Sequence, residues 1–379
     1  MLEETPVDSP LCAKMALFLP LLPNLQKPLF FMAMRIKITS FTFFSLAATW
    51  VASLALLAAC QLPSGKTPPH ALSPATLSRL FQPLPEAPPA LPERIQLGRM
   101  LFYDLRLSIT QQMSCNTCHL LQNYGVDGLP TSLSHKGRSG PRNTPTVYNA
   151  ALQSAQFWDG RARSVEEQAG HPLLAETEMG MPTADDVEKT LRSIPGYSTA
   201  FAAAFQGQND PITFQNISLA IATFERGLLT PSRFDRYLAG DLDQLTPEAL
   251  QGLQTFLDAG CAGCHNGVGL GGTLASPAAL ALLTEPATRS AQTLAVIKIP
   301  SLRNVTKTAP YLHDGSVATL EETVARMAPR QAPLTPEAIA QIVVFLGTLT
   351  GELPADYIAM PALPEDGPET ASFAKTTYP

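Results

Sequence analysis

Two short motifs of cysteine and histidine constrain this chain more than any other feature. One runs from Cys115 to His119 and the other from Cys261 to His265, and both have the spacing C-x-x-C-H. Two cysteines at this spacing can reach the two vinyl groups of one porphyrin as thioethers, while the adjacent histidine binds the iron. The sequence therefore predicts two covalently bound c-type haems, attached through Cys115, Cys118, His119, Cys261, Cys264 and His265.

The same cysteines allow two other interpretations. Four thiolates can bind a structural zinc ion, but ribbon-type sites separate their cysteine pairs by about 15–20 residues. Cys118 and Cys261 are much farther apart than that, which does not fit a zinc ribbon. A disulfide within each motif stays open for a protein in an oxidising compartment, although it leaves both histidines without a role.

Composition limits the class of protein. A length of 379 residues suggests two or three domains. The 35 prolines and 24 glycines favour short helices joined by irregular chain, as expected where a cofactor fills part of the core. A net charge of −6 argues against a nucleic-acid-binding protein.

The first 60 residues carry the signals of an export leader. Arg35 and Lys37 precede the uncharged run 38–59, as in secretory signals, and we expect translation to start at Met32 or Met34. The run ends in LAAC at Cys60, which resembles the bacterial lipoprotein box, where the cysteine is lipidated. The alternatives are a core helix and an uncleaved anchor, since about 20 apolar residues span a bilayer. Lipoprotein and anchor both predict a protein tethered to a membrane outside the cytoplasm.

The rest of the chain divides by composition and periodicity. Residues 61–92 are rich in proline and predict an extended tether. Periodic apolar residues then predict helices, two of which begin at TPE sequences, with Thr246 and Thr335 as N-caps. We expect a leader (1–60), a tether (61–92), two haem domains (93–228 and 229–351) and a proline-rich surface tail (352–379).

The chain also repeats itself after each haem motif. The block from Arg142 to Gly160, which begins RN and ends WDG, echoes the block from Arg303 to Gly315, which begins RN and ends HDG. Each block precedes a short glutamate-rich segment. The predicted fold is therefore mostly α, with two related cytochrome c-like haem domains packed together.

Several stretches between about Gln96 and Gly351 are similar to one known family. They are LFYD at 101–104, the first haem motif, GPRNTPT at 140–146, QFWDGR at 156–161, EM at 178–179, FLDAGC at 256–261, SLRN at 301–304 and PYLH at 310–313. In these stretches the chain resembles the bacterial di-haem cytochrome c peroxidases, whose superfamily includes the methylamine-utilisation di-haem enzymes. Residues 271–296 depart from the family pattern.

The resemblance implies different axial ligands for the two haems. His119 would bind the first, peroxidatic haem, with His135 as a removable distal ligand; His171 is a rival for that place. His265 and Met327 would bind the second haem, and a thioether ligand raises the potential, which suits electron storage. By residue type alone, Met327 would be a core methionine.

The resemblance also assigns residues around the first haem. Glu178 would be the acid–base group in peroxide cleavage, and Gln168 would hydrogen-bond peroxide or water. Trp158 would lie between the haems, where it either couples them or only fills space.

A calcium ion is implied by the resemblance alone. Asn143, Thr308 and Pro310 would supply oxygens to an ion between the domains, and backbone and amide oxygens suit Ca²⁺.

The function implied is that of a periplasmic, membrane-tethered peroxidase. It would reduce hydrogen peroxide to water with electrons from a small cytochrome c or cupredoxin, and family members are commonly homodimers. Reduction of the second haem would release the loop carrying His135. One alternative is a di-haem oxidase that matures a cofactor in another protein, a group with tyrosine where this chain has Met327. Another is a non-enzymatic electron carrier, which needs neither Glu178 nor a removable ligand.

Overall fold

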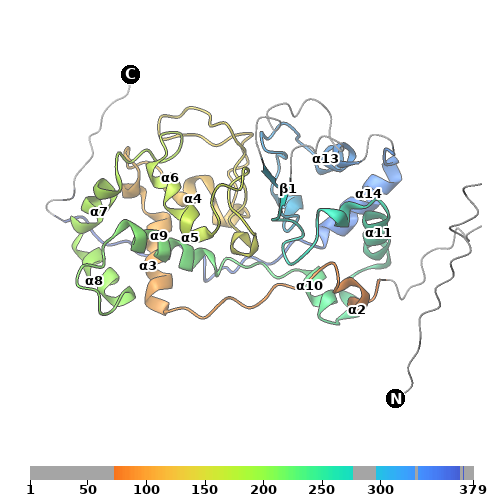
Figure 1. The fold of residues 1–379 in the computed structure, drawn as a ribbon, viewed down its shortest axis with the longest axis horizontal. Coiled ribbons are helices and arrows are strands. Elements are labelled where there is room, and N and C mark those ends of the chain that lie inside the picture. Colours follow the sequence, from red (N-terminus) through yellow and green to blue (C-terminus); the bar gives the residue numbers. More distant parts are fainter. Residues whose placement is uncertain (1–71, 276–295, 329–331, 368–369, 371–379) are drawn as a thin grey trace, which may run out of the picture. The chain divides into compact units, whose positions relative to one another are not determined.

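The computed structural model describes residues 72–275, 296–328, 332–367 and 370, all within one compact unit that begins at Thr67. Cys60 and the predicted leader lie outside the described residues. In the part described, the fold is mostly helical, as predicted, with one antiparallel pair of strands, β1 (Leu274–Ala275) and β2 (Ile297–Lys298) (Figure 1). No helix in these ranges is long and apolar enough to cross a bilayer.

The helices are short and mostly capped by hydroxyl side chains. Thr246 and Thr335 accept hydrogen bonds from the N–H groups of Ala249 and Ala338, as the TPE sequences predict. The α-helices are α2 (Pro74–Leu77), α3 (Pro92–Tyr103), α4 (Cys115–Cys118), α5 (Val165–Ala169), α6 (His171–Leu174), α7 (Ala184–Arg192), α8 (Pro195–Ala204), α9 (Phe214–Glu225), α10 (Arg233–Leu238), α11 (Pro247–Asp258), α13 (Leu320–Met327) and α14 (Pro336–Gly347). Single 3-10 turns are η2 (Leu105–Leu107), η3 (Leu121–Asn123), η4 (Ala150–Leu152), η5 (Leu242–Gln244), η6 (Cys261–Gly263) and η9 (Val305–Lys307).

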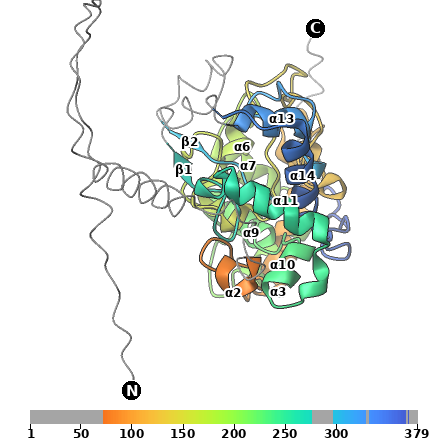
Figure 2. The same ribbon diagram turned by 90° about the vertical axis from the view of Figure 1, so that its right-hand side faces the viewer.

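Two hydrophobic cores are each organised around a pair of helices that cross at a glycine. In the first, α3 packs on α9, and a Cβ at Gly98 would lie 1.9 Å from the carbonyl oxygen of Ala220. In the second, α11 packs on α14, and a Cβ at Gly252 would lie 2.0 Å from the carbonyl oxygen of Gln341. Figures 1 and 2 show α11 and α14 side by side. A side chain at either glycine would therefore push the helices apart.

The sequence repeat is a structural repeat. Asn149 and Asn304 both adopt left-handed backbone conformations, with φ of 59° and 62°, and each begins a 3-10 turn. Short antiparallel bridges follow in each block, Gln156 with Ala162 and Tyr311 with Val317. The blocks around Trp158 and His313 thus share one local backbone course.

The first ten described residues of the predicted tether, 72–81, are packed, whereas residues 82–91 form no helix or strand and are mostly exposed. Leu77 and Phe81 are fully buried in the second core, where the Phe81 ring lies 5.5 Å from that of Phe234. The N–H of Gly267, two residues after His265, donates to the carbonyl of Leu80. Proline content suggested a spacer, but two large apolar side chains anchor this segment beside the second haem motif.

The tail after α14 returns to the first core. Ile358 is buried there, and Tyr357 stacks on Phe224 with ring centroids 5.1 Å apart. The hydroxyl of Tyr103 donates to the carbonyl of Ile358, and Arg106 pairs with Asp366 at 2.6 Å. The described tail is mostly exposed or half-buried, as expected for a surface segment, but Ile358 and the partly buried Tyr357 anchor it on the α3–α9 core.

One buried ion pair holds together several segments of the second core. Arg303, 1% exposed, meets both carboxylate oxygens of Asp235 at 2.9 Å, and Asp235 also accepts from the N–H groups of Leu84 and Ser232. Burial would raise the pKa of Asp235, but hydrogen bonds and the charge of Arg303, with help from Ser232, lower it.

We expect Asp235→Ala to lower the free energy of unfolding by about 3–5 kcal/mol, because it leaves the Arg303 guanidinium buried without a counter-charge. The measurement is denaturant unfolding of the haem-loaded protein. The control is Glu352→Ala, which removes an exposed carboxylate 3.3 Å from Arg236 and should cost less than about 1 kcal/mol. Equal effects of the two variants would contradict the role assigned to the buried pair.

Candidate functional site

The first motif forms the short helix α4 and the turn after it. Ser114 caps the helix in a capping box with Thr117, whose hydroxyl oxygen accepts from the N–H of Ser114 at 2.9 Å. His119 follows directly, and its Nδ1 lies 3.2 Å from the carbonyl oxygen of Gly125. This contact fixes the ring and leaves Nε2 available to a metal. Burial lowers the pKa of His119 and so favours the neutral, metal-binding imidazole.

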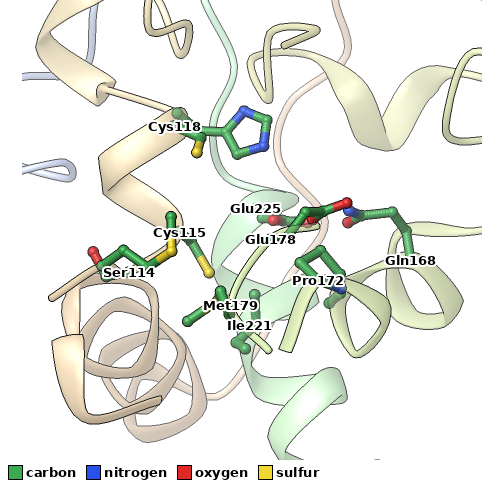
Figure 3. A pocket seen from close by; sticks show the side chains of 12 residues that line it. Ser114, Cys115, Cys118, Gln168, Pro172, Glu178, Met179, Ile221 and Glu225 are labelled. Atoms are coloured by element: carbon green, nitrogen blue, oxygen red, sulfur yellow. The ribbon is translucent and has the colours of Figure 1, made fainter. Parts of the chain in front are cut away.

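The motif lines a hollow together with two residues predicted to work on peroxide. Figure 3 shows Cys115 and Cys118 on one side and Gln168, Pro172 and Glu178 on the other. The structure thus brings the predicted Cys115, Cys118, His119, Gln168 and Glu178 together, although α4 and Glu178 are some 60 positions apart in the chain. The remaining lining residues are Met113, Ser114, Ala169, Met179, Ile221 and Glu225.

The residues of this hollow fit a covalently attached haem. Both thiols are free of disulfides, and burial, followed by the charges of Asp127 and Glu178, raises the pKa of Cys118 to about 12. Apolar lining residues such as Ile221 and Met179 suit a porphyrin, and the fixed His119 ring offers a nitrogen to its iron.

Glu178 sits where the chain turns between α6 and α7. Its N–H donates to the carbonyl of Ala175 at 2.9 Å, and its own carbonyl accepts the N–H of His135 at 2.8 Å. Burial raises the pKa of the Glu178 carboxyl, and the positive charge of Arg161 opposes that effect. The backbone therefore ties Glu178 to the loop that carries His135.

His135 lies beside this turn rather than in the lining of the hollow. A Cβ on Gly180 would come within 2.4 Å of the His135 ring, so the ring rests on the glycine backbone. Both ring nitrogens are buried and have no hydrogen-bond partner among the described residues. Burial, then the charge of Lys136, lowers the pKa of His135, which keeps the imidazole neutral.

Glu225 is a site residue that the sequence analysis missed. It is the last residue of α9, is 6% exposed, and lines the hollow with Gln168 and Glu178. Burial, and after it the charge of Glu166, raises the pKa of Glu225 to about 8. The available signal was that Glu225 is the only charged residue in a twelve-residue helix with a buried apolar face.

The second motif repeats the local design of the first. Cys261–Gly263 form η6, which begins after Gly260 in a left-handed conformation, and the Nδ1 of His265 lies 3.2 Å from the carbonyl oxygen of Leu270. Met327 ends α13 and is half-buried. His171, the rival ligand of the first haem, is exposed, and its ring packs edge-on against Phe157.

Trp158 and the residues considered for calcium lie where the repeated blocks meet. The indole N–H of Trp158 donates to the carbonyl of Asn143 at 2.9 Å, and its ring is edge-on to His313 at 6.4 Å. The amide of Asn143 donates to the carbonyl of Leu129, and the Thr308 hydroxyl to that of Val305; Pro310 follows a cis peptide bond. Within the described ranges, no three acidic, cysteine or histidine side chains cluster as metal ligands.

Comparisons with known proteins agree with this site. A profile of the di-haem cytochrome c peroxidases matches residues 92–243. The cytochrome c551 peroxidase of Pseudomonas aeruginosa is 41% identical over 316 residues, which cover 78% of this chain and 91% of that protein. The methylamine utilization protein MauG of Methylorubrum extorquens is 37% identical over 258 residues, covering 63% of this chain and 69% of that protein.

A similar fold is also known from crystallography. The structure of a MauG-like protein associated with microbial copper homeostasis superposes with a TM-score of 0.62 and 28% identity, covering 80% of this chain and 99% of that one. The identity of 41% over most of both chains, the profile match and the arrangement of Cys115, Cys118 and His119 lead to one conclusion. The chain belongs to the di-haem cytochrome c peroxidase family.

Proposed function

We propose that this protein is a cytochrome-c peroxidase that reduces hydrogen peroxide to water with electrons from a small redox protein. The observation that carries the proposal is the hollow in which Glu178 and Gln168 face the thiols and imidazole of Cys115, Cys118 and His119. The identity with a named cytochrome c551 peroxidase supports the same function. Haem bound in this hollow would supply electron transfer and a metal that binds peroxide.

Glu178 is the group we assign to proton movement in peroxide. Its carboxylate would take a proton from one peroxide oxygen and give it to the other, which then leaves as water. Gln168, on the same side of the hollow, would hold peroxide or water by a hydrogen bond. The low polarity around Glu178, which raises its pKa, makes the carboxylate a stronger base than an exposed one.

His135 is the residue we assign to gating. Its ring nitrogens lack protein partners in the described structure, and its loop is hydrogen-bonded to the carbonyl of Glu178. A neutral imidazole with no hydrogen bond from a described residue to either ring nitrogen is suited to be a removable ligand of the first haem. We propose that this loop moves on reductive activation, which would open the site to peroxide and reposition Glu178 in one step.

The second half of the molecule would receive the electrons. His265 and Met327 are the ligands we propose for its haem, and Trp158, which contacts both repeats, would lie on the way to the first haem. A calcium ion bound by oxygens of Asn143, Thr308 and Pro310 would stabilise this junction. We further propose a periplasmic location with a lipid tether at Cys60, a cytochrome c or cupredoxin as donor, and a homodimer.

A second candidate function is maturation of a cofactor in another protein, as similarity to MauG suggests. Met327 favours the peroxidase, because the maturation enzymes that this chain resembles carry tyrosine at that position. Steady consumption of peroxide with reduced cytochrome c as the only donor would support the peroxidase. Oxidation of the donor only when a second protein is present would support the alternative.

Glu178→Gln should lower kcat/KM for peroxide by about 10²–10⁴-fold, because the amide cannot accept the proton. Since the base must be ionised and its pKa is raised, wild-type activity should fall as the pH drops through that raised pKa, and the variant should lack this limb. The measurement is peroxide reduction with reduced cytochrome c over a pH series. The exposed Glu248→Gln is the control; equal activities would refute the role of Glu178.

His135→Gly should give a protein that reacts with peroxide without prior reduction, because the removable ligand is gone. The oxidised variant should also show the absorption of high-spin haem, which the oxidised wild type should lack. His171→Gly, which removes the exposed rival, is the matched control and should leave both properties unchanged. Complete inactivity of His135→Gly with both haems attached would count against gating by His135.

A further inference from the structure

Peroxide reduction needs protons that Glu178 does not supply. The balanced reaction takes one H₂O₂, two electrons and two protons to two molecules of water. Glu178 shifts a proton that peroxide already carries, so it adds none. The electrons come from the redox partner, whereas both net protons must travel from solvent into a largely apolar hollow. Some group near the hollow must pass them inward.

Glu225 is placed to do this. It lines the hollow at the end of α9, beside α4, and only 6% of it is exposed. No described group donates a hydrogen bond to its carboxyl, and no cation is paired with it; the neighbouring Arg226 turns to Glu166 instead. A carboxyl buried for structural reasons is normally paired or hydrogen-bonded, so Glu225 lacks an evident structural role.

Glu166 is a second carboxyl close enough to Glu225 to affect its pKa. It lies on α5, which packs on α9 through Val165 and Ala222. Its side chain is 30% exposed, and Arg226, 37% exposed, contacts its Oε1 at 2.6 Å. One carboxyl therefore faces the hollow and a second, on the adjoining helix, faces solvent.

We propose that Glu225 and Glu166 form the path by which protons enter the peroxide site, an inference that rests on the proposed peroxidase function. Glu225 gives its carboxyl proton to the second peroxide oxygen, the one that remains after the first has left as water. Its own O–H bond breaks and an O–H bond forms on that oxygen, which the electrons of the redox partner reduce. The resulting carboxylate recovers a proton from solvent by way of Glu166. Two such cycles supply the two protons of one turnover.

The charges around Glu225 support this direction of transfer. Burial and the negative Glu166 raise its pKa to about 8, so the carboxyl carries a proton at neutral pH. Cys115 of α4, which is half-buried, lines the same hollow. The cations of the other described helices packed on α9 are engaged elsewhere. On α3, Arg94 lies over the Phe205 ring and Arg99 donates to the tail carbonyls; on α7, Lys189 and Arg192 pair with Asp186 and Asp210.

Steady-state kinetics of Glu225 and Glu166 variants test the proposed proton path. Glu225→Gln keeps the size of the side chain but cannot release a proton, so kcat should fall about 100-fold with KM for peroxide nearly unchanged and both haems attached. Glu225→Asp should restore part of the rate. Glu166→Gln should lower kcat less, because water reaches that position. Glu167→Gln, an exposed neighbour on α5, is the control and should match the wild type.

Stability provides a readout that does not depend on activity. An acid whose pKa is 4.5 when unfolded and about 8 when folded stabilises the protein below pH 4.5 and loses that contribution as the pH rises through 8. The Tm of Glu225→Gln should therefore gain several degrees over wild type between pH 5 and pH 8. The same series on Glu167→Gln should show no such trend.

The outcomes separate the two proposals. Wild-type kcat and pH profile in Glu225→Gln would overturn the proton path even if the peroxidase is active. A Tm difference that does not change with pH would do the same, because it would mean that Glu225 holds no proton. A wild type that ignores peroxide would refute the peroxidase. If Glu225→Gln failed to attach haem, Glu225→Asp and Glu166→Gln would decide the matter, and wild-type rates in both would overturn the path.

Discussion

A single buried hydroxyl joins the two repeats of this fold. The side-chain amides of Asn149 and Asn304 both donate to Oγ1 of Thr230, at 2.8 and 2.9 Å, and all three residues are at most 1% exposed. Each asparagine also accepts a backbone hydrogen bond through its side-chain oxygen. Asn149 accepts from the N–H of Thr230, and Asn304 accepts from the N–H of Gly351. Asparagine tolerates the left-handed backbone needed here. Losing either partner would leave a buried amide unsatisfied, so this contact fixes how the repeats meet.

Equivalent backbone then presents different side chains in the two repeats. Trp158 and His313 occupy matching places after the joined asparagines, and the two rings meet edge-on where the blocks approach. Helix α5 and the chain after it place Gln168 and Glu178 at the first hollow, whereas α13, which follows the second block, ends in Met327. A duplicated scaffold thus carries a polar, open site in one repeat and an apolar sulfur in the other. This asymmetry would suit the proposed division between peroxide chemistry and electron storage.

Much of this could be predicted from the sequence, and the rest fails for identifiable reasons. Both haem motifs, the TPE caps at Thr246 and Thr335 and the apolar faces of α9 and α14 are local patterns, and resemblance added Glu178 and Gln168. The packing of Phe81 and Ile358 was missed because isolated apolar residues among prolines have no period. Glu225 was missed because a charge at a helix end usually faces solvent; only the tertiary packing around α9 buries it.

The two carboxyls of the hollow differ in what opposes or reinforces their burial. At Glu178 the nearby positive charge of Arg161 opposes the effect of desolvation on the pKa. This charge favours the ionised form, which can accept a proton. At Glu225 the negative charge of Glu166 adds to desolvation, which favours the protonated form that can donate one. Burial raises the pKa of both acids, and neighbouring charges of opposite sign separate the two pKa values, which is a means of obtaining a base and an acid from one residue type. The neighbouring charges, rather than the carboxyls themselves, would then assign the two roles, and exchanging the sign at position 161 or 166 would disturb one role without the other.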